Sequence, residues 1–309
     1  MRLKLGRPDL ERYAGLQDVP AAGAGLRVTF LGVSSLLLGD GASAILTDGF
    51  FSRPSLASVI ARRIAPDHAR IQAALARAGI RRLDAVVPVH THDDHALDSP
   101  VVAERTGAVL VGGESVANLG RGYGLPEDRI RVVTPGEPVS YGAFELTFVE
   151  STHCPPDRYP GPITEPVVPP ARAQAYRCGE AWSLLVEHAS GRSALIQGSA
   201  GDVPGALAGQ RAEVVYLGVG QLGLQSDEYL HTYWAETVEA VGARRVVLIH
   251  FDDFFRPLDQ PLRALPYAGD DLDVTIRTLT ALARDRGVDL HLPTLWLRED
   301  PWLRPDGRT

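Results

Sequence analysis

A short apolar run leads directly into a dense group of histidines and aspartates in the segment AVVPVHTHDDH, residues 85–95. The run has the length and β-branched content of a buried strand, so the polar group is predicted to lie in the loop that follows. In an extended segment His90 and His92 point the same way, because side chains alternate with a period of two, and both imidazoles can reach one ion. If the chain next turns into a helix, Asp94 and His95 project elsewhere, which suits a second ion.

The donor types indicate the kind of metal. Imidazole and carboxylate together favour zinc, manganese or iron, whereas magnesium and calcium prefer shells of oxygen alone. The alternative is a set of surface histidines, with Asp93 or Asp94 capping a helix. Three of the chain's nine histidines fall within 90–95, with a carboxylate between them, and this density favours a metal site. We therefore predict two divalent ions, zinc in the first place, with manganese or iron as alternatives.

The composition excludes several classes of protein. A net charge of −7 argues against a nucleic-acid binder, so we expect a small-molecule substrate. Cys154 and Cys178 are the only cysteines, which excludes a disulfide framework and a cysteine-rich zinc module but leaves a bond between the two open. There is no apolar stretch long enough for a membrane span and no signal-peptide pattern. We expect a cytoplasmic protein, and the oligomeric state is left open.

Strand and helix patterns alternate without a linker, which predicts a single domain over residues 26–298. We expect residues 1–25 to be a loosely attached leader and residues 299–309 to be a polar tail. Strands are predicted at 26–31, 35–38, 44–47, 85–89, 108–111, 131–133, 144–149, 182–187, 193–197, 214–217, 246–249 and 288–292, and helices at 69–78, 100–106, 114–119, 228–241 and 273–286.

The ligand motif, His90-x-His92-x-Asp94-His95 after a buried strand, resembles the signature of the metallo-β-lactamase-fold hydrolases. The segment 30–49, with the pattern FLG…S…LL…G…ILTDG, is similar to the β-meander with which members of that family begin. The resemblance implies an α/β fold of four layers, an αββα sandwich, with the metal site at one edge.

The resemblance also implies a ligand set. His153 and His250 each follow a predicted strand, and this strand-end position supports both independently. Asp94 would bind a metal and would also be the catalytic residue that holds the nucleophile and passes on a proton. The implied ligands are His90, His92 and His153 for one ion, and Asp94, His95 and His250 for the other.

One position departs from the family pattern. Most members place a metal-bridging aspartate after the glycine that follows the strand 193–197, whereas this chain has Ser199. Asp202 could bridge instead, Ser199 could bind through water, or the second metal could be weak or absent. Zinc β-lactamases also lack this aspartate and hold two ions, so the change does not exclude a dinuclear site. We favour Ser199 as the equivalent residue and keep Asp202 as an alternative.

Four further residues are candidates for supporting roles. Asp48 is either a turn residue before a glycine or a carboxylate behind the metals. Arg53 is expected to be exposed to solvent, with contact to an anionic substrate as the alternative. Asp252 and Asp253 either accept the free ring N–H of His90, His92 or His250, or cap a helix.

A proline-dense segment follows His153. Residues 154–170, CPPDRYPGPITEPVVPP, cannot form regular helix or sheet. A long irregular segment beside a catalytic strand end is more often a substrate-covering loop than a linker. We name it the proline-rich loop and regard its Arg158 and Tyr159 as candidate substrate contacts.

These observations predict a metal-dependent hydrolase. A metal-bound hydroxide would attack an ester, lactone, amide or phosphodiester, because a divalent ion lowers the pKa of bound water to about 7. Among relatives, the chain looks most similar to the lactonase-like and phospholipase-D-like hydrolases. The alternatives are a non-catalytic metal-binding scaffold or regulatory protein of the same fold, and an iron-dependent oxidoreductase.

Overall fold

Strands with two apolar faces build the centre of the computed structural model, which describes residues 4–303. Ile45 and Leu46 are neighbours in one strand, yet they belong to different hydrophobic clusters. Val87 and Val86 of the adjacent strand divide in the same way. Because successive side chains of a strand point to opposite faces, these strands are covered by a second sheet on one side and by helices on the other.

The first sheet has seven strands in the order β14-β1-β2-β3-β4-β5-β6. The strands from β14 to β3 pair in antiparallel fashion, and those from β3 to β6 pair in parallel. They are β1 (Arg27–Phe30), β2 (Leu36–Gly39), β3 (Ala44–Thr47), β4 (Ala85–Val87), β5 (Val109–Gly112), β6 (Ile130–Val132) and β14 (Arg298–Glu299).

The second sheet also has seven strands, in the order β13-β12-β11-β10-β9-β8-β7. Here β10 to β13 pair in parallel and β7 to β10 pair in antiparallel fashion. They are β7 (Pro138–Tyr141), β8 (Phe144–Ser151), β9 (Ala181–His188), β10 (Ser193–Gln197), β11 (Val214–Gly218), β12 (Arg245–Ile249) and β13 (Asp289–His291).

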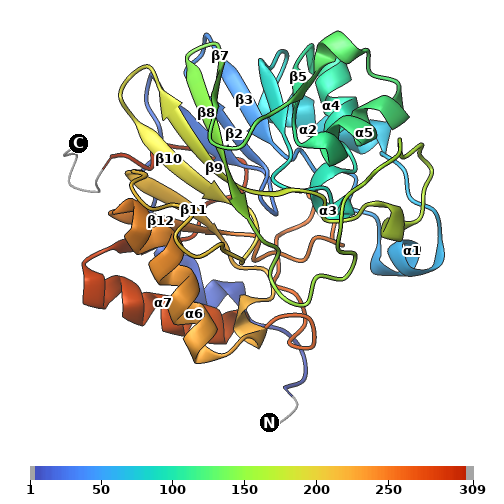
Figure 1. The fold of residues 1–309 in the computed structure, drawn as a ribbon. Coiled ribbons are helices and arrows are strands. Elements are labelled where there is room, and N and C mark those ends of the chain that lie inside the picture. The colour runs from blue at the N-terminus through green and yellow to red at the C-terminus, as the bar shows by residue number, and fades with distance from the viewer. Residues whose placement is uncertain (1–3, 304–309) are drawn as a thin grey trace.

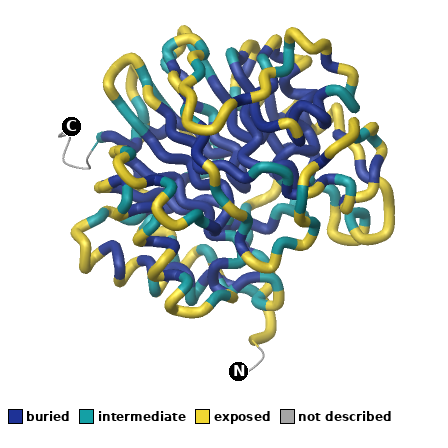
Figure 2. Tube along the Cα trace, viewed as in Figure 1, coloured by how far each residue is buried: buried dark blue, intermediate teal, exposed yellow. Residues whose placement is uncertain are grey.

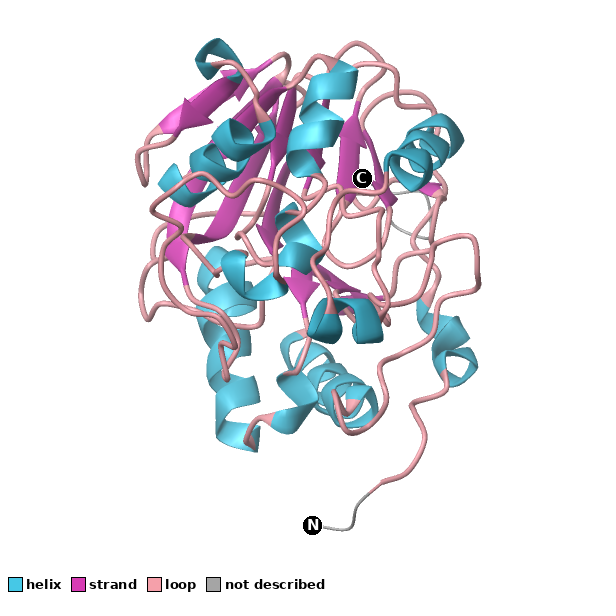
Figure 3. Ribbon diagram, turned by 90° about the vertical axis from the view of Figure 1, so that its right-hand side faces the viewer, coloured by secondary structure: helices cyan, strands magenta, loops and turns pink. Residues whose placement is uncertain are grey.

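Helices cover both outer faces of the sandwich, with α2, α4 and α5 on the first sheet and α6 and α7 on the second (Figure 1). Long loops cover the side of the sandwich that faces the viewer in Figure 3. The helices are α1 (Leu56–Ala61), α2 (His68–Ala78), α3 (Asp93–Ala96), α4 (Ser99–Thr106), α5 (Glu114–Tyr123), α6 (Asp227–Trp234) and α7 (Leu272–Arg286), with 3₁₀ turns η1 (Leu10–Leu16), η2 (Glu127–Arg129), η3 (Ala173–Ala175) and η4 (Leu222–Leu224) and a π-helical turn η5 (Ala235–Glu239).

In helix α2, the local sequence determines where the helix begins, where it ends and which face is buried. Asp67 caps its first turn by accepting hydrogen bonds from the N–H groups of Ala69 and Arg70. Gly79 ends the helix in the left-handed conformation, at φ 72°. Ile71 and Leu75, one turn apart, are buried against the first sheet. The helix therefore presents one apolar stripe to the sheet and a polar face to solvent.

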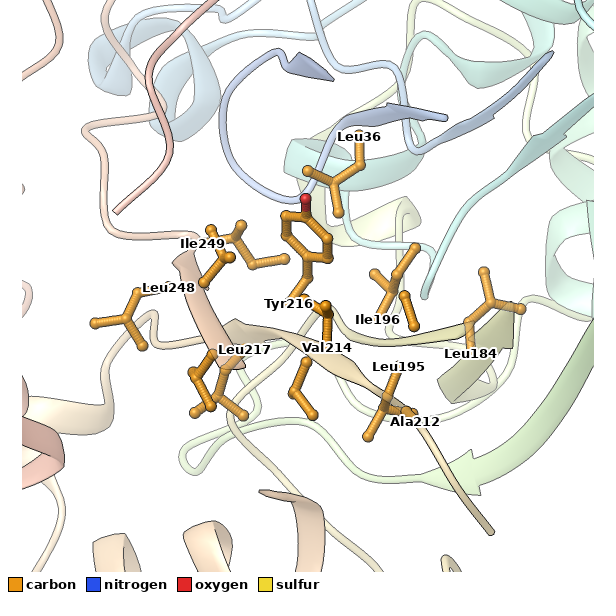
Figure 4. Close-up of a cluster of buried hydrophobic side chains, with 14 of the residues drawn as sticks. Leu36, Leu184, Leu195, Ile196, Ala212, Val214, Tyr216, Leu217, Leu248 and Ile249 are labelled. Atoms are coloured by element: carbon orange, nitrogen blue, oxygen red, sulfur yellow. The ribbon is translucent and has the colours of Figure 1, made fainter. Parts of the chain in front are cut away.

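The interior between the two sheets is the main core. Figure 2 shows the buried residues concentrated in the strands and the exposed ones in the outer helices and loops. In Figure 4, Tyr216 of β11 points toward Leu36 of β2, so side chains of the two sheets meet across this layer. The strands that end at the site are thus held by a continuous apolar core.

The predicted four-layer αββα sandwich of the metallo-β-lactamase type is confirmed. The strand at 44–47 has the predicted bounds, and α2 begins one residue earlier than predicted. The sequence patterns missed α1 and β7, which are short and half exposed. No helix in residues 4–303 combines the length and the apolar character that crossing a bilayer requires.

The expectation of a loosely attached leader is corrected by the structure. Leu10, Tyr13 and Leu16 of η1 pack against the main core, and the N–H of Leu292 donates to the carbonyl oxygen of Leu16. The three apolar residues recur every third position, which is the signal of a short amphipathic turn. Part of the expected polar tail is also packed, because Glu299 is buried in β14, whereas residues 304–309 lie outside the described residues. The domain boundaries stay predictions.

Candidate metal centre

Strand ends from both sheets bring the predicted ligands together at one edge of the sandwich. β4 leads into the loop and short helix α3 that carry four of them, while β8 and β12 each lead to one histidine. In Figure 1, α3 lies below α4 and α5. Two groups of three donors have ligand atoms within 4.8 Å of one another: His90, His92 and His153, and Asp94, His95 and His250.

The first group consists of imidazoles alone. His90 Nε2 lies 3.2 Å from His92 Nδ1, and both rings are buried. Burial lowers the pKa of both, and burial together with His92 lowers the pKa of His153 to about 4. His153 Nδ1 lies 2.6 Å from the carbonyl oxygen of Cys154, and when it donates there its Nε2 keeps a lone pair. The three rings are therefore held in the neutral form that binds metals.

The second group contains a carboxylate. His95 Nε2 and His250 Nε2 are 3.2 Å apart, and Asp94 Oδ2 lies 3.5 Å from His250 Nε2. Burial opposes the charge on Asp94, but His95 and His250 outweigh it and hold the pKa of this carboxyl well below its usual range. Burial likewise acts to lower the pKa of His95, yet Asp48 and Asp94 raise it overall. Asp94 is thus an anion beside two imidazoles.

Asp48 lies directly behind the second group. Its Oδ2 is 2.9 Å from His95 Nδ1 and accepts a hydrogen bond from the Ser34 hydroxyl, while its Oδ1 accepts one from the N–H of Val89. The carboxylate is fully buried and has φ 51°, a left-handed conformation that is costly for a residue with a side chain. It contacts the ring nitrogen of His95 that points away from the group, and Ser34, which sequence analysis missed, helps to hold it.

Asp157 contacts the first group and was also missed. It lies in the proline-rich loop, where its Oδ1 accepts a hydrogen bond from the N–H of Tyr159 and is 3.2 Å from His92 Nε2. Cys178 completes a third cluster of potential ligand atoms with these two residues. Asp157 follows no strand, so nothing in its local pattern distinguishes it from a turn residue. Both cysteines are free and buried, and burial raises the pKa of their thiols.

The structure places His250 in a strained turn. Its φ is 59°, its N–H donates to the carbonyl oxygen of Val33, and Val33 is also left-handed, at φ 53°. Gly220 packs so closely that an added Cβ would lie 2.7 Å from His250 Nδ1. Contacts from two loops therefore determine where this ring points.

The expectations for Arg53 and Asp252 are corrected by the structure. Arg53 is fully buried and pairs at 2.7 Å with Asp252, so it is neither exposed nor part of the cavity lining. Asp252 uses its other oxygen to accept a hydrogen bond from the N–H of Val33 and bonds to no site histidine. The two residues stabilise the loop that holds His250, because a buried guanidinium needs a buried partner.

Asp253 also differs from its predicted role. Its Oδ1 accepts a hydrogen bond from the N–H of Phe255, and its Oδ2 lies 2.9 Å from Arg263 Nε and 3.2 Å from Arg7 Nη1. No contact with a site histidine is present among the described residues. Asp253 instead stabilises a tight turn and forms ion pairs with two arginines.

Ser199 and Asp202 both follow β10, but only Ser199 lies at the cavity. Ser199 lines the cavity beside the two groups, and its hydroxyl accepts a hydrogen bond from the N–H of Cys154. Asp202 is absent from the cavity lining and from the ligand clusters of residues 4–303, and its carbonyl oxygen binds the Thr152 hydroxyl. The alternative in which Asp202 bridges two metals therefore has no support in the geometry.

A cavity of 710 Å³ opens over both groups. The proline-rich loop contributes Arg158 and Tyr159 to the cavity lining, and their contact with a substrate stays a prediction. The ring of Tyr159 lies 6.5 Å from that of His92. Sequence analysis missed the walls formed by α1, by residues 253–269 and by Arg7 of the N-terminal segment. The two groups thus face a space large enough for a small molecule.

Comparison with known proteins identifies the family. The sequence model described as "Beta-lactamase superfamily domain" matches residues 44–251, a range that contains all six predicted ligands. The chain belongs to the beta-lactamase superfamily. This confirms the family that the histidine motif predicted, whereas the lactonase-like and phospholipase-D-like branch stays a prediction.

Relatives and solved structures agree with this assignment. A UPF0173 metal-dependent hydrolase of Rhizobium etli is 30% identical over 128 residues, which cover 41% of this chain and 48% of that protein. The chain thus spans about half the length of the curated relatives that it matches.

Two solved structures show the same fold at low identity. Igni18, a metallo hydrolase from the archaeon Ignicoccus hospitalis, has 15% identity and a TM-score of 0.50, with 86% of this chain and 94% of that chain covered. CmlA, a diiron β-hydroxylase from Streptomyces venezuelae, has 14% identity and a TM-score of 0.53, with 90% of this chain and 54% of that chain covered.

Proposed function

We propose that this chain is a metal-dependent hydrolase with a dinuclear centre. The observation that carries the proposal is the convergence of two three-residue donor groups at the floor of one cavity. Membership of the superfamily supports it, and so does the name of the Rhizobium etli relative, a metal-dependent hydrolase.

The residues fit a pair of divalent ions. Two nitrogens that bind one tetrahedral zinc at about 2.0–2.1 Å each are about 3.3 Å apart. The pairs His90–His92 and His95–His250 place ring nitrogens 3.2 Å apart. The set of imidazoles and one carboxylate suits zinc, with manganese or iron as alternatives. When bound, such ions supply a nucleophile from water at neutral pH and polarise the oxygen of the scissile bond.

The chain's own residues would do the rest of the chemistry. Asp94 lines the cavity as an anion, so it can orient a water molecule by accepting a hydrogen bond from it. Asp48 and Asp157 would hold His95 and His92 through the ring nitrogens that point away from the ions. Ser199 would occupy the place of the usual bridging aspartate. The substrate would be a small ester, lactone, amide or phosphodiester.

Metal analysis and turnover together test this function. Protein purified without added metal should contain about two zinc or manganese ions per chain and should hydrolyse members of a panel of aryl esters, lactones and phosphodiesters. His92→Ala should lose turnover with an unchanged circular dichroism spectrum, because it removes a donor of the first group. Full turnover in that variant would contradict the proposal. A chain that folds, binds metal and turns over nothing would favour the scaffold alternative.

A second candidate is an iron-dependent oxidoreductase. The specific observation in its favour is the shared fold with CmlA, a diiron β-hydroxylase. Visible absorption of the purified protein and consumption of oxygen would support it, whereas a colourless zinc protein that hydrolyses esters would exclude it.

A further inference from the structure

One wall of the cavity carries two guanidinium groups on a single carboxylate. Arg263 Nε lies 2.9 Å and Arg7 Nη1 3.2 Å from Asp253 Oδ2. Arg7 Nη1 also donates to the carbonyl oxygen of Ala264, at 2.7 Å. All three charged residues line the cavity and lie outside the range 44–251 that the family model matches. We name this group the arginine cluster.

The cluster by itself carries a net positive charge. One arginine would neutralise Asp253, whose side chain is only 5% exposed, yet two are present. Each guanidinium has five N–H donors. The contacts found in residues 4–303 use one nitrogen of Arg7 and one of Arg263, so most of their donors are left over. Their side chains are 32% and 42% exposed, which leaves these donors accessible from the cavity.

The surroundings of the cluster strengthen its attraction for anions. Phe254, Phe255, Leu265 and Pro266 line the same wall, and apolar walls lower the local dielectric constant. Phe254 also connects the cluster to the metal centre, since its ring lies 5.8 Å from that of His250. The cavity that holds the arginines therefore also offers an apolar surface, and one of its rings lies beside a predicted ligand.

We propose that the arginine cluster is an anion-binding subsite that receives a carboxylate or phosphate group of the substrate, at the end remote from the scissile bond. This inference rests on the proposed hydrolase function only in taking the bound anion to be a substrate. The ligand class is thus an amphipathic anion, with an apolar segment against Phe254 and Phe255 and a charged end on Arg7 and Arg263. Paired guanidinium groups suit such ligands because they bind planar or tetrahedral oxyanions with several charge-assisted hydrogen bonds.

Binding of two simple probes tests the subsite without turnover. Isothermal titration calorimetry on the zinc-loaded full chain compares glutarate, which has two carboxylates, with butyrate, which has one. Glutarate should bind about tenfold more tightly, the effect of one charge-assisted contact. Arg7→Gln and Arg263→Gln should each reduce this preference at least threefold. Arg277→Gln, which removes the same charge from α7 outside the cavity, should leave it unchanged.

Asp253→Asn should change the preference for glutarate in the opposite direction. The amide keeps an acceptor for the N–H of Phe255 but frees both guanidinium groups, so the preference for glutarate should rise. Circular dichroism verifies that each variant is folded. An equal affinity for both probes in the wild type, an unchanged preference in both arginine variants, or a loss of preference in folded Asp253→Asn would overturn the proposal.

A kinetic experiment separates this inference from the hydrolase itself. The wild type should hydrolyse the 4-nitrophenyl monoester of glutarate with a higher kcat/KM than 4-nitrophenyl butyrate, and Arg263→Gln should remove the difference. Hydrolysis of both esters at equal rates would leave the hydrolase standing and overturn the subsite. Glutarate preference in binding without hydrolysis of either ester would support the subsite and contradict the hydrolase.

Discussion

Two aspartates from distant parts of the sequence each contact one site histidine. Asp48 lies 2.9 Å from His95 Nδ1, and Asp157 lies 3.2 Å from His92 Nε2. A carboxylate on the second ring nitrogen fixes the tautomer and orientation of a ligand histidine and makes it a better donor. Each donor group therefore has one histidine that lies beside a buried or half-buried carboxylate.

The role of Asp157 can be tested against a matched aspartate. Asp157→Asn should weaken zinc binding about 10–100-fold, because the amide no longer attracts the ring proton of His92. Titration against a chromophoric chelator measures this affinity. Asp202→Asn, which carries the same change outside the cavity, should bind zinc like the wild type. Weaker zinc binding in Asp202→Asn alone would contradict this role of Asp157 and would favour Asp202 as the bridging ligand.

The pair Arg53–Asp252 makes a prediction about stability. Arg53→Met should lower the free energy of unfolding by about 3–5 kcal/mol, because it leaves the buried carboxylate of Asp252 without its partner. Urea unfolding measures the loss. Arg62→Met is the control, since Arg62 is exposed, and its effect should stay within about 0.5 kcal/mol. Equal stabilities of the two variants would contradict the assignment of Arg53 to the core.

At the scale of elements, α5 anchors the proline-rich loop. The side-chain amide of Asn118 donates to the carbonyl oxygen of Ile163, and the Ser115 hydroxyl accepts from the N–H of Ile163. At the start of the loop, the N–H of Cys178 donates to the carbonyl oxygen of Tyr159. A stiff loop held at these points keeps Asp157 and Tyr159 over the site.

Loosening that anchor should affect substrate binding more than chemistry. Asn118→Ala removes the hydrogen bond to Ile163, so amides in the loop should exchange hydrogen faster and KM should rise several-fold with a smaller change in kcat. Hydrogen exchange and steady-state kinetics measure the two effects. Gln72→Ala on the exposed face of α2 should change neither. Unchanged exchange in Asn118→Ala would show that the loop does not depend on α5.

At the scale of the whole molecule, buried carboxyls make stability depend on pH. Burial raises the pKa of Asp270 to about 7, although backbone N–H groups of Gln221, Gly223 and Asp271 oppose this. Between the unfolded pKa near 4 and the folded pKa near 7, the folded state binds a proton that the unfolded state does not. The free energy of unfolding therefore falls as pH rises through this window, and the loss is complete above it.

Asp270→Asn should remove that contribution. Relative to the wild type, the variant should gain on the order of 2–3 kcal/mol of stability between pH 5 and pH 8. Urea unfolding of both proteins at each pH, with the metal removed by chelation, measures the difference, and titrations common to both cancel. A constant difference across this range would contradict the raised pKa.

Much of this protein follows from its sequence because the informative patterns are local. The short apolar runs of the buried strands, the spacing of His90, His92, Asp94 and His95, and the polar residues at strand ends all lie within short windows. Resemblance to one superfamily then supplied the order of the layers and the partition of the six ligands. The fold and the family are confirmed, and the ligands and their metals stay predictions.

Only the tertiary structure decided which distant residues share a site. Arg7 and Asp253 are 246 positions apart and line one cavity wall, while Asp157 reaches His92 from a loop with no periodic pattern. The sequence predicts that Arg53 is exposed to solvent, yet it is buried and pairs with Asp252. Local composition determines how a segment folds and which face it buries, but contacts between distant loops depend on how the two sheets pack. The sequence therefore determined the fold and the candidate ligands, and the packing decided which residues support those ligands and which residues line the cavity.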